Sequence, residues 1–327
     1  MRSSATRRSP SGEPRLTAVA EAPGKVIITG EHFVVHGALA LAAAIGQRTR
    51  AEASRAPGLV VETPLARSAP GGTGQLPVHR LVREMYRMRS AEPRVRVTIT
   101  SELPAGSGLG SSASAMVATA AAVSGLEGWP TDPPSIIEAA MFGERLVHGR
   151  PSGIDVAVSA AGGVLQFRVG EPPRPLELAG PLRLLVVQSG ERRSSKRLIS
   201  KVSSTKGAHP HLFAGLCDSA SLITELATER LLGGRLRDLG RIMTYNHAVL
   251  ATVGASNERL DRLVDLCLEC GCYGAKLTGA GGGGSVLALP AEGAEEATAA
   301  LLARRGVRSF LSEVPSGGVR VWTSEGR

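Results

Sequence analysis

Aromatic side chains are scarce in this sequence, where Phe, Trp and Tyr together make up 3% of the 327 residues. Proteins that hold single-stranded nucleic acid stack its bases on aromatic rings, so the scarcity argues against that class although the net charge is +9. The arginines are also scattered, apart from the N-terminal tail and GERRSSKRLISK at 190–201. We therefore expect no nucleic-acid partner and relate the basic charge to an anionic substrate.

Long apolar runs are absent as well, since no uninterrupted stretch reaches the length of a membrane span. The first residues, MRSSATRRSPSGEPR, are basic and hold no apolar segment, so we expect no secretory signal. We expect residues 1–16 to form a disordered basic tail, with a transit peptide as the alternative. We expect no membrane partner, a cytoplasmic location and a homodimer.

Cysteine is also rare, with only Cys217, Cys267, Cys270 and Cys272. Cys267 and Cys270 have the spacing of half a zinc knuckle, but no second pair of ligands follows at a suitable spacing. Both fall on an apolar helical stripe within 260–270, so we interpret them as core thiols. This usage fits a reducing cytoplasm.

The length predicts two domains, and the Pro/Gly-rich segment at 169–181 marks their boundary. We place the first domain at 17–178 and the second at 179–327. The first is expected to contain two short strands around a turn at Pro23–Gly24, strands over 38–54, 94–103 and 162–167, and helices over 74–90, 111–125 and 131–149. Gly125 and Gly149 are expected to end the last two helices, and Ser135 with Glu138 to form a capping box.

The second domain is expected to alternate strands and helices. The predicted strands are 182–188, 273–279, 284–290 and 307–314, with helices within 194–270 and over 294–306. This pattern indicates an α+β domain of the split βαβ kind.

The stretch GSGLGSSASA at 106–115 carries three glycines between a predicted strand and a predicted helix. A helix that starts near Gly110 or Ser111 presents free N–H groups and the positive end of its dipole, and glycine lets the backbone approach an anion. The lysine of a Walker-type loop is missing, because Ser111, Ser112 and Ala113 occupy its place. The pattern favours a phosphate site, with a plain strand–turn–helix junction as the alternative.

A second glycine run lies in KLTGAGGGGSVLAL at 276–289, between two apolar strands. A hairpin needs one or two glycines rather than five. The surplus indicates a backbone that lies against a ligand or another segment, and the alternative is a flexible loop.

Three charged residues stand out against their neighbours. Lys25 lies in an otherwise apolar stretch, where a lone lysine would reach out to the surface, and Glu144 lies on an amphipathic helix, where alone it would be solvated. Asp155 is framed by Ile154 and Val156, and an acid in such a frame is usually paired. Lys25 is a plausible partner, although spacing alone cannot prove it.

Four segments, taken in order, resemble the superfamily of galactokinase, homoserine kinase, mevalonate kinase and phosphomevalonate kinase (GHMP), and within it the mevalonate kinase family. They are APGKVIITGEHFVVHG, ELPAGSGLGSSAS, GERLVHGRPSGIDVAVSAAGG and AKLTGAGGGGSVLAL. The resemblance covers about residues 17–325. It implies an α+β fold with an N-terminal ribosomal-protein-S5-like domain and a C-terminal ferredoxin-like domain, with the active site between them.

The resemblance also implies roles for individual residues. Asp155 and Lys25 match the catalytic aspartate and lysine, and Ser112 and Glu144 match Mg²⁺ ligands. The loop that holds the phosphates of ATP matches Pro104, Gly106, Ser107, Gly108, Gly110, Ser111 and Ser112. The substrate side matches Glu31, His32, Val35, Arg193, Thr278, Gly279 and Ala280, of which Arg193 aligns only approximately.

The function that the resemblance implies is an ATP-dependent, Mg²⁺-dependent transfer of phosphate to the 5-hydroxyl of mevalonate in isoprenoid synthesis. Two alternatives stay open. One is a related kinase that acts on phosphomevalonate, the 3-hydroxyl of mevalonate, a sugar or homoserine. The other is a catalytically silent binding protein, against which the presence of Lys25, Glu144 and Asp155 argues.

Overall fold

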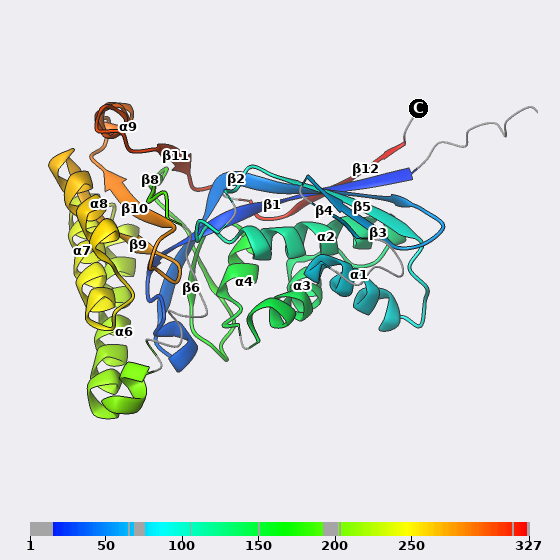
Figure 1. Cartoon of the computed structure of the whole chain (residues 1–327), viewed down its shortest axis with the longest axis horizontal. Coiled ribbons are helices and arrows are strands. Elements are labelled where there is room, and N and C mark those ends of the chain that lie inside the picture. Colours follow the sequence, from blue (N-terminus) through cyan, green and yellow to red (C-terminus); the bar gives the residue numbers. More distant parts are fainter. Residues whose placement is uncertain are drawn as a thin grey trace, which may run out of the picture.

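The structure, a computed structural model, describes residues 16–64, 66–68, 76–104, 106–149, 151–191, 202, 204–315 and 317–325. These residues form an eight-stranded sheet and a four-stranded sheet, each packed against helices (Figure 1). The predicted α+β class is confirmed.

The larger sheet is built around two long antiparallel strands, β1 (Leu16–Thr29) and β2 (Ala40–Arg55). Its strand order is β12-β1-β2-β5-β3-β4, and β6 and β7 extend it from the first half of β2. The shorter strands are β3 (Val60–Thr63), β4 (Ala66–Ser68), β5 (Val95–Ser101), β6 (Val164–Phe167), β7 (Arg174–Leu176) and β12 (Arg320–Glu325). β5 alternates as predicted, with Val95, Val97 and Ile99 turned into the core.

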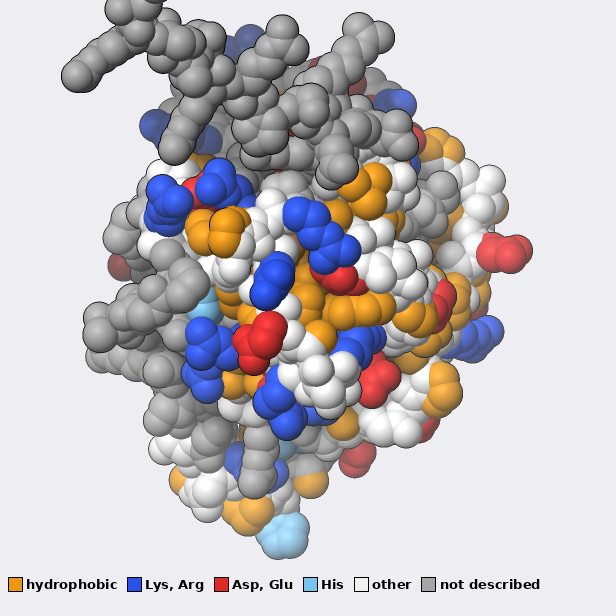
Figure 2. Space-filling view, turned by 90° about the vertical axis from the view of Figure 1, so that its right-hand side faces the viewer, with side chains coloured by type: hydrophobic (Ala, Val, Ile, Leu, Met, Phe, Trp, Pro, Cys, Tyr) orange, Lys and Arg blue, Asp and Glu red, His pale blue; other side chains and the backbone are white. Residues whose placement is uncertain are grey.

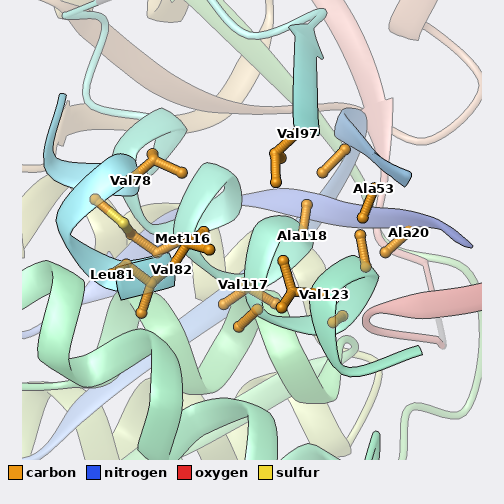
Figure 3. Close-up of a cluster of buried hydrophobic side chains, with 14 of the residues drawn as sticks. Ala20, Ala53, Val78, Leu81, Val82, Val97, Met116, Val117, Ala118 and Val123 are labelled. Carbon is orange, nitrogen blue, oxygen red and sulfur yellow. The ribbon is translucent and has the colours of Figure 1, made fainter. Parts of the chain in front are cut away.

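Helices cover one face of this sheet (Figure 1). They are α1 (Pro77–Arg87), α2 (Ser111–Glu127), α3 (Pro133–His148) and α4 (Ile154–Ala161). The central helix, α2, contacts β1 and β2 on one side and α3 and α4 on the other. Its many alanines allow this close approach on several sides, and Figure 3 shows its Val117 and Ala118 among the side chains of the sheet and of α1.

The smaller sheet has the order β11-β8-β10-β9, and all its pairs are antiparallel. Its strands are β8 (Arg183–Gln188), β9 (Cys272–Thr278), β10 (Ser285–Pro290) and β11 (Ser309–Glu313). The helices that accompany it are α6 (Pro210–Leu232), α7 (Leu236–Thr252), α8 (Glu258–Glu269) and α9 (Glu295–Arg304). The strands and helices predicted for the second half of the chain are therefore present.

The two sheets share a hydrophobic core. One cluster of buried side chains contains Ile28 of β1, Leu41 of β2, Val186 of β8 and Met243 of α7. Because these residues come from both sheets, the two halves of the fold are packed together along β1 and β2.

Three local predictions were wrong. The segment around Pro23–Gly24 is not a turn, because β1 runs through it with a shift of register between Pro23 and Lys25 while it pairs with β2. Helix α2 passes Gly125 and ends at Glu127. Its C-cap is Gly128, whose backbone is left-handed (φ +69°) and whose N–H donates to the carbonyl of Ser124. Gly125 instead allows close packing, since a Cβ there would lie 2.8 Å from the side chain of Val321.

The third error concerns the start of α3. Asp132, not Ser135, caps this helix, because its carboxylate accepts the backbone N–H of Ser135 at 3.0 Å. The predicted end of the helix at Gly149 is confirmed.

The last strand lies outside the half to which the sequence analysis assigned it. β12 pairs with β1 in the larger sheet, with Leu16 opposite Glu325 and Glu21 opposite Arg320. The chain therefore crosses back from the smaller sheet at its end. The domain limit at residues 178 and 179 stays a prediction.

Several features of composition can be followed in the structure. Cys267 and Cys270 are buried in the core of the second half, as predicted, and Cys272 is buried there too. All four cysteines are free. Of the helices described, none is long and apolar enough to cross a membrane. On the end of the molecule in Figure 2, basic side chains are interspersed with acidic and apolar ones.

Candidate active site

A cavity of about 820 Å³ lies where the motifs meet. Its wall includes Lys25 of β1, the turn after β1, the glycine loop at 106–110 and the first residues of α2 and α4. Gly279 and Ala280 of the second glycine run close it from the other sheet. Segments from across the chain thus form one site.

The glycine loop has a left-handed backbone at every second residue. The φ angles of Gly106, Gly108 and Gly110 are +73°, +92° and +75°. Between them Leu109 is fully buried, and its carbonyl accepts the N–H of Lys25 at 2.9 Å. This anchor fixes the loop to β1, and the loop leads into α2, whose first N–H groups have no partners within the helix.

Gly110 also makes room for Lys25. A Cβ at Gly110 would lie 2.8 Å from Cγ of Lys25, closer than carbon atoms pack. The lysine stem therefore passes over the loop, and its ammonium group reaches the cavity beside the helix start.

Lys25 and Asp155 form an ion pair, with Nζ and Oδ1 2.9 Å apart. The lysine side chain is 4% exposed and the aspartate 35%, so the carboxylate is the member that a ligand in the cavity can reach. Asp155 lies in the first turn of α4, after Gly153 with φ +93°. The pairing that the sequence suggested is present.

Ser112 and Glu144 supply oxygen atoms on the same wall. The Ser112 hydroxyl donates a hydrogen bond to Oε1 of Glu144 at 2.8 Å, and Glu144 is 2% exposed. A hydroxyl and a carboxylate are hard ligands of the kind Mg²⁺ takes. Among the described residues no group of three or more His, Cys, Asp or Glu side chains is placed to hold a metal, so any cation here needs oxygens from a ligand as well.

Another part of the cavity wall is formed by the turn after β1. His32 has a left-handed backbone (φ +62°), and its Nε2 lies 2.8 Å from the carbonyl oxygen of Ala280. Val35 lines the cavity beside it and is half exposed. This part of the wall combines a hydrogen-bonding imidazole with an apolar side chain.

Some predicted residues do not line the cavity. Ser107 belongs to the glycine loop, but its hydroxyl donates to the carbonyl of Pro104 at 2.7 Å. The Thr278 hydroxyl is buried and accepts the N–H of Ile27 at 3.1 Å. Both side chains therefore stabilise the backbone around the site without lining the cavity. Arg193 lies outside the described residues.

Glu31 lines the cavity, but its carboxylate is buried and paired with Lys276 of β9. Burial raises the pKa of Glu31, against the opposing effect of Lys276, and burial lowers the pKa of Lys276. The sequence analysis missed Lys276, although it is the only charged residue in CYGAKLT and the same reasoning had singled out Lys25.

Two exposed basic residues that were not predicted, His36 and Lys206, also line the cavity. Their Nδ1 and Nζ atoms lie 3.3 Å apart. Burial, followed by the nearby lysine, lowers the pKa of His36. Nothing in the sequence could have joined them, because 170 positions separate the two residues.

Comparison with known proteins agrees with this geometry. Residues 77–163 match the family model described as GHMP kinases N terminal domain, and 223–308 match GHMP kinases C terminal. A mevalonate kinase from Aeropyrum pernix is 37% identical over 322 residues, which span 94% of this chain and 99% of that relative. The chain belongs to the mevalonate kinase family.

Solved structures of this family have the same fold. The L. major mevalonate kinase in complex with R-mevalonate is 30% identical, with a TM-score of 0.76 over 94% of this chain and 95% of that one. The Methanococcus jannaschii mevalonate kinase is 25% identical, with a TM-score of 0.79 over 94% and 100%. The predicted family and two-domain GHMP kinase fold are confirmed.

Proposed function

We propose that this enzyme transfers the γ-phosphoryl group of ATP to the 5-hydroxyl of mevalonate, a step of the mevalonate pathway. The observation that carries the proposal is the Lys25–Asp155 pair, which faces a cavity bounded by the glycine loop and by the turn with His32. Phosphoryl transfer requires a phosphate donor and an acceptor hydroxyl held roughly in line. An ion pair that lies between a phosphate-binding loop and an acceptor pocket meets that requirement.

The glycine loop and the start of α2 hold the nucleotide phosphates in this proposal. Three left-handed glycines leave the backbone uncovered by side chains, and the helix terminus contributes about half a positive charge. Lys25 supplies the full charge that a Walker-type loop takes from its own lysine.

Ser112 and Glu144 would hold Mg²⁺, because their oxygens are hard and adjacent. When bound with the nucleotide, this ion offsets phosphate charge. Two protein ligands suffice, since Mg²⁺ usually keeps waters and takes the rest of its ligands from phosphates.

Asp155 orients the acceptor hydroxyl and accepts its proton. In a loose transition state the hydroxyl proton need not leave early, so orientation is the first task of the carboxylate. Lys25 holds the carboxylate in place and offsets charge that builds up on the transferred group.

The acceptor lies in the part of the cavity that His32 and Val35 form. Mevalonate is a small carboxylate with two hydroxyls and a methyl group. The imidazole of His32 can bond to it and Val35 can pack against its methyl group, while the predicted role of Arg193 stays a prediction. The cytoplasmic location and the homodimer also stay predictions.

The test is an assay of ADP release with a panel of acceptors, followed by NMR to locate the new phosphate. The panel contains mevalonate, phosphomevalonate, galactose and homoserine. We expect turnover with mevalonate and a phosphate on its 5-oxygen. Turnover restricted to another acceptor, or a phosphate on the 3-oxygen, would replace this proposal with one of the related kinases.

A further inference from the structure

A buried charged pair lies behind the acceptor part of the cavity. Glu31 comes from the turn after β1, and Lys276 comes from β9 of the other sheet. Their side chains are 1% and 0% exposed. A buried ion pair is often no more stabilising than apolar residues of the same size, so its presence here calls for a role other than stability.

Every donor of the lysine is used. Besides Glu31, Nζ of Lys276 donates to the carbonyl of Ile27 at 3.2 Å and to that of Leu277 at 2.6 Å. The ammonium group therefore ties the end of β1 and the following turn to β9. A network with all its members bonded fixes one geometry.

Asn246 of α7 closes the network from a third side. Its amide nitrogen donates to Oε2 of Glu31 at 3.2 Å, and its amide oxygen accepts the N–H of Gly30 at 3.4 Å. The backbone of the turn and the side chain of Glu31 are thus held by the same residue.

The turn so held contains His32, whose left-handed backbone is uncommon for a residue with a side chain. Such a conformation persists only where the surroundings impose it. Glu31 precedes His32 directly, and the imidazole bonds to Ala280, four residues after Lys276. His32 and Ala280 join the turn to the second glycine run, and each therefore lies close in sequence to one member of the charged pair.

We propose that Lys276 is a positioning residue for the acceptor, because its bonds to Glu31 and Ile27 hold the turn in which His32 faces the cavity. Lys276 itself does not touch the substrate. This inference rests on the proposed function, since it takes the His32 part of the cavity as the acceptor site. It assigns to Glu31 a supporting role in place of the substrate contact that the family resemblance implies.

The first experiment is a double-mutant cycle on the full chain with Lys276→Met and His32→Ala. Lys276→Met is expected to raise the KM for mevalonate about tenfold, within the range of coupling measured for neighbouring residues, while the KM for ATP stays within about twofold. If Lys276 acts through His32, the double variant has the same KM as His32→Ala alone. Independent effects that multiply would overturn the proposal.

The second experiment separates positioning from stability. The Glu31→Met/Lys276→Met variant replaces the pair with apolar side chains and is expected to recover the melting temperature that Lys276→Met loses. Its KM for mevalonate is expected to stay raised, because methionine cannot hold Ile27 or accept from Asn246. A KM equal to that of the unaltered enzyme would overturn the inference, and this variant decides the question if Lys276→Met fails to fold.

The control is Leu289→Ala, a fully buried position of β10 next to β9. It is expected to lower the melting temperature and to leave both KM values unchanged. A raised KM for mevalonate in this control would show that a loss of stability alone is enough to raise that KM. If the unaltered enzyme uses another acceptor, the proposed function fails, and the same variants measured with that acceptor still decide the role of Lys276.

Discussion

At the scale of single residues, the site depends on a few charges whose partners lie far away in the chain. Lys25 and Asp155 are 130 positions apart and form one ion pair. The sequence predicted this pair, because each charge lies in an apolar frame and both fall in motifs of the family. Lys276 lies in such a frame too, within the segment AKLTGAGGGGSVLAL, but the resemblance assigned it no role, so its role emerged only when its contacts with Glu31 and Ile27 were known.

Asp155→Asn keeps the shape of the side chain but removes its charge and basicity. We expect kcat to fall by about 10²- to 10⁴-fold, the usual contribution of a positioned acid–base group, with the KM for ATP little changed. Steady-state kinetics with each substrate varied in turn measures this. A kcat within about threefold of the unaltered enzyme would contradict the role of Asp155.

At the scale of elements, the sequence predicted which helices and strands exist better than where they end. The chain at Pro23–Gly24 has the composition of a turn, yet β1 continues through it because β2 pairs with the strand both before and after this point. Gly125 has the composition of a helix stop, yet its role is to let α2 approach β12. In both cases contacts with distant segments override a local preference. Such contacts cannot be predicted from the neighbouring residues in the sequence.

The glycine loop offers a matched pair of substitutions. Gly110→Ala places a methyl group against the stem of Lys25, whereas a Cβ at Gly106 meets no described residue within 4 Å. Both positions are left-handed, so both variants carry a strain of about 1–2 kcal/mol, and only Gly110→Ala displaces the lysine. We expect a much larger loss of kcat for Gly110→Ala than for Gly106→Ala, measured at saturating ATP. Equal losses would mean that the clearance for Lys25 is not what Gly110 provides.

Helix α1 contains a buried histidine that favours folding only while it is neutral. His79 is fully buried, and neither ring nitrogen has a hydrogen-bond partner among the described residues. Burial, with Arg83 adding to it, lowers the pKa of His79. Since the folded pKa lies below the unfolded value of about 6.5, the folded state loses stability as the pH falls below that value.

We therefore expect His79→Leu to reduce the fall in melting temperature between pH 7.5 and pH 5.5 by roughly 1–2 °C, the shift that about 1 kcal/mol produces in a chain of 327 residues. Thermal unfolding across that range measures the effect. His211→Leu, at an exposed position of α6, serves as the control. An unchanged slope for His79→Leu would show that His79 titrates in the folded state as it does in the unfolded chain.

At the scale of the whole molecule, the path of the chain is the part least visible in the sequence. The sequence analysis ended the second half at the last residue, whereas β12 returns to the larger sheet. The link before β12 passes close to the end of α4, and Arg48 donates to the carbonyls of Gly317 and Gly318 at 3.2 and 3.0 Å. No local pattern signals such a return, because the strand is short and its partner lies about 300 residues earlier.

Two neighbouring glycines test how tightly this return is held. A Cβ at Gly318 would lie 2.0 Å from the carbonyl oxygen of Ala160, while at Gly317 it would meet nothing within 4 Å in the part of the chain that the structure describes. We expect Gly318→Ala to destabilise the fold by about 1–3 kcal/mol, as overpacking does, and Gly317→Ala to have little effect. Chemical denaturation measures both, and a Gly318→Ala variant as stable as its neighbour would mean that the link can move away from α4.

The double attachment of β1 has a consequence for chimaeric enzymes. This strand bonds to the glycine loop through Lys25 and, through Ile27, to Thr278 and Lys276 of the smaller sheet. Exchanging the second half with that of a relative at the Pro/Gly-rich boundary would therefore separate β1 from the side chains that fit it, and would also bring in a foreign β12. A chimaera that keeps its activity has to take the end of β1, the turn with His32 and the matching face of β9 from the same parent enzyme.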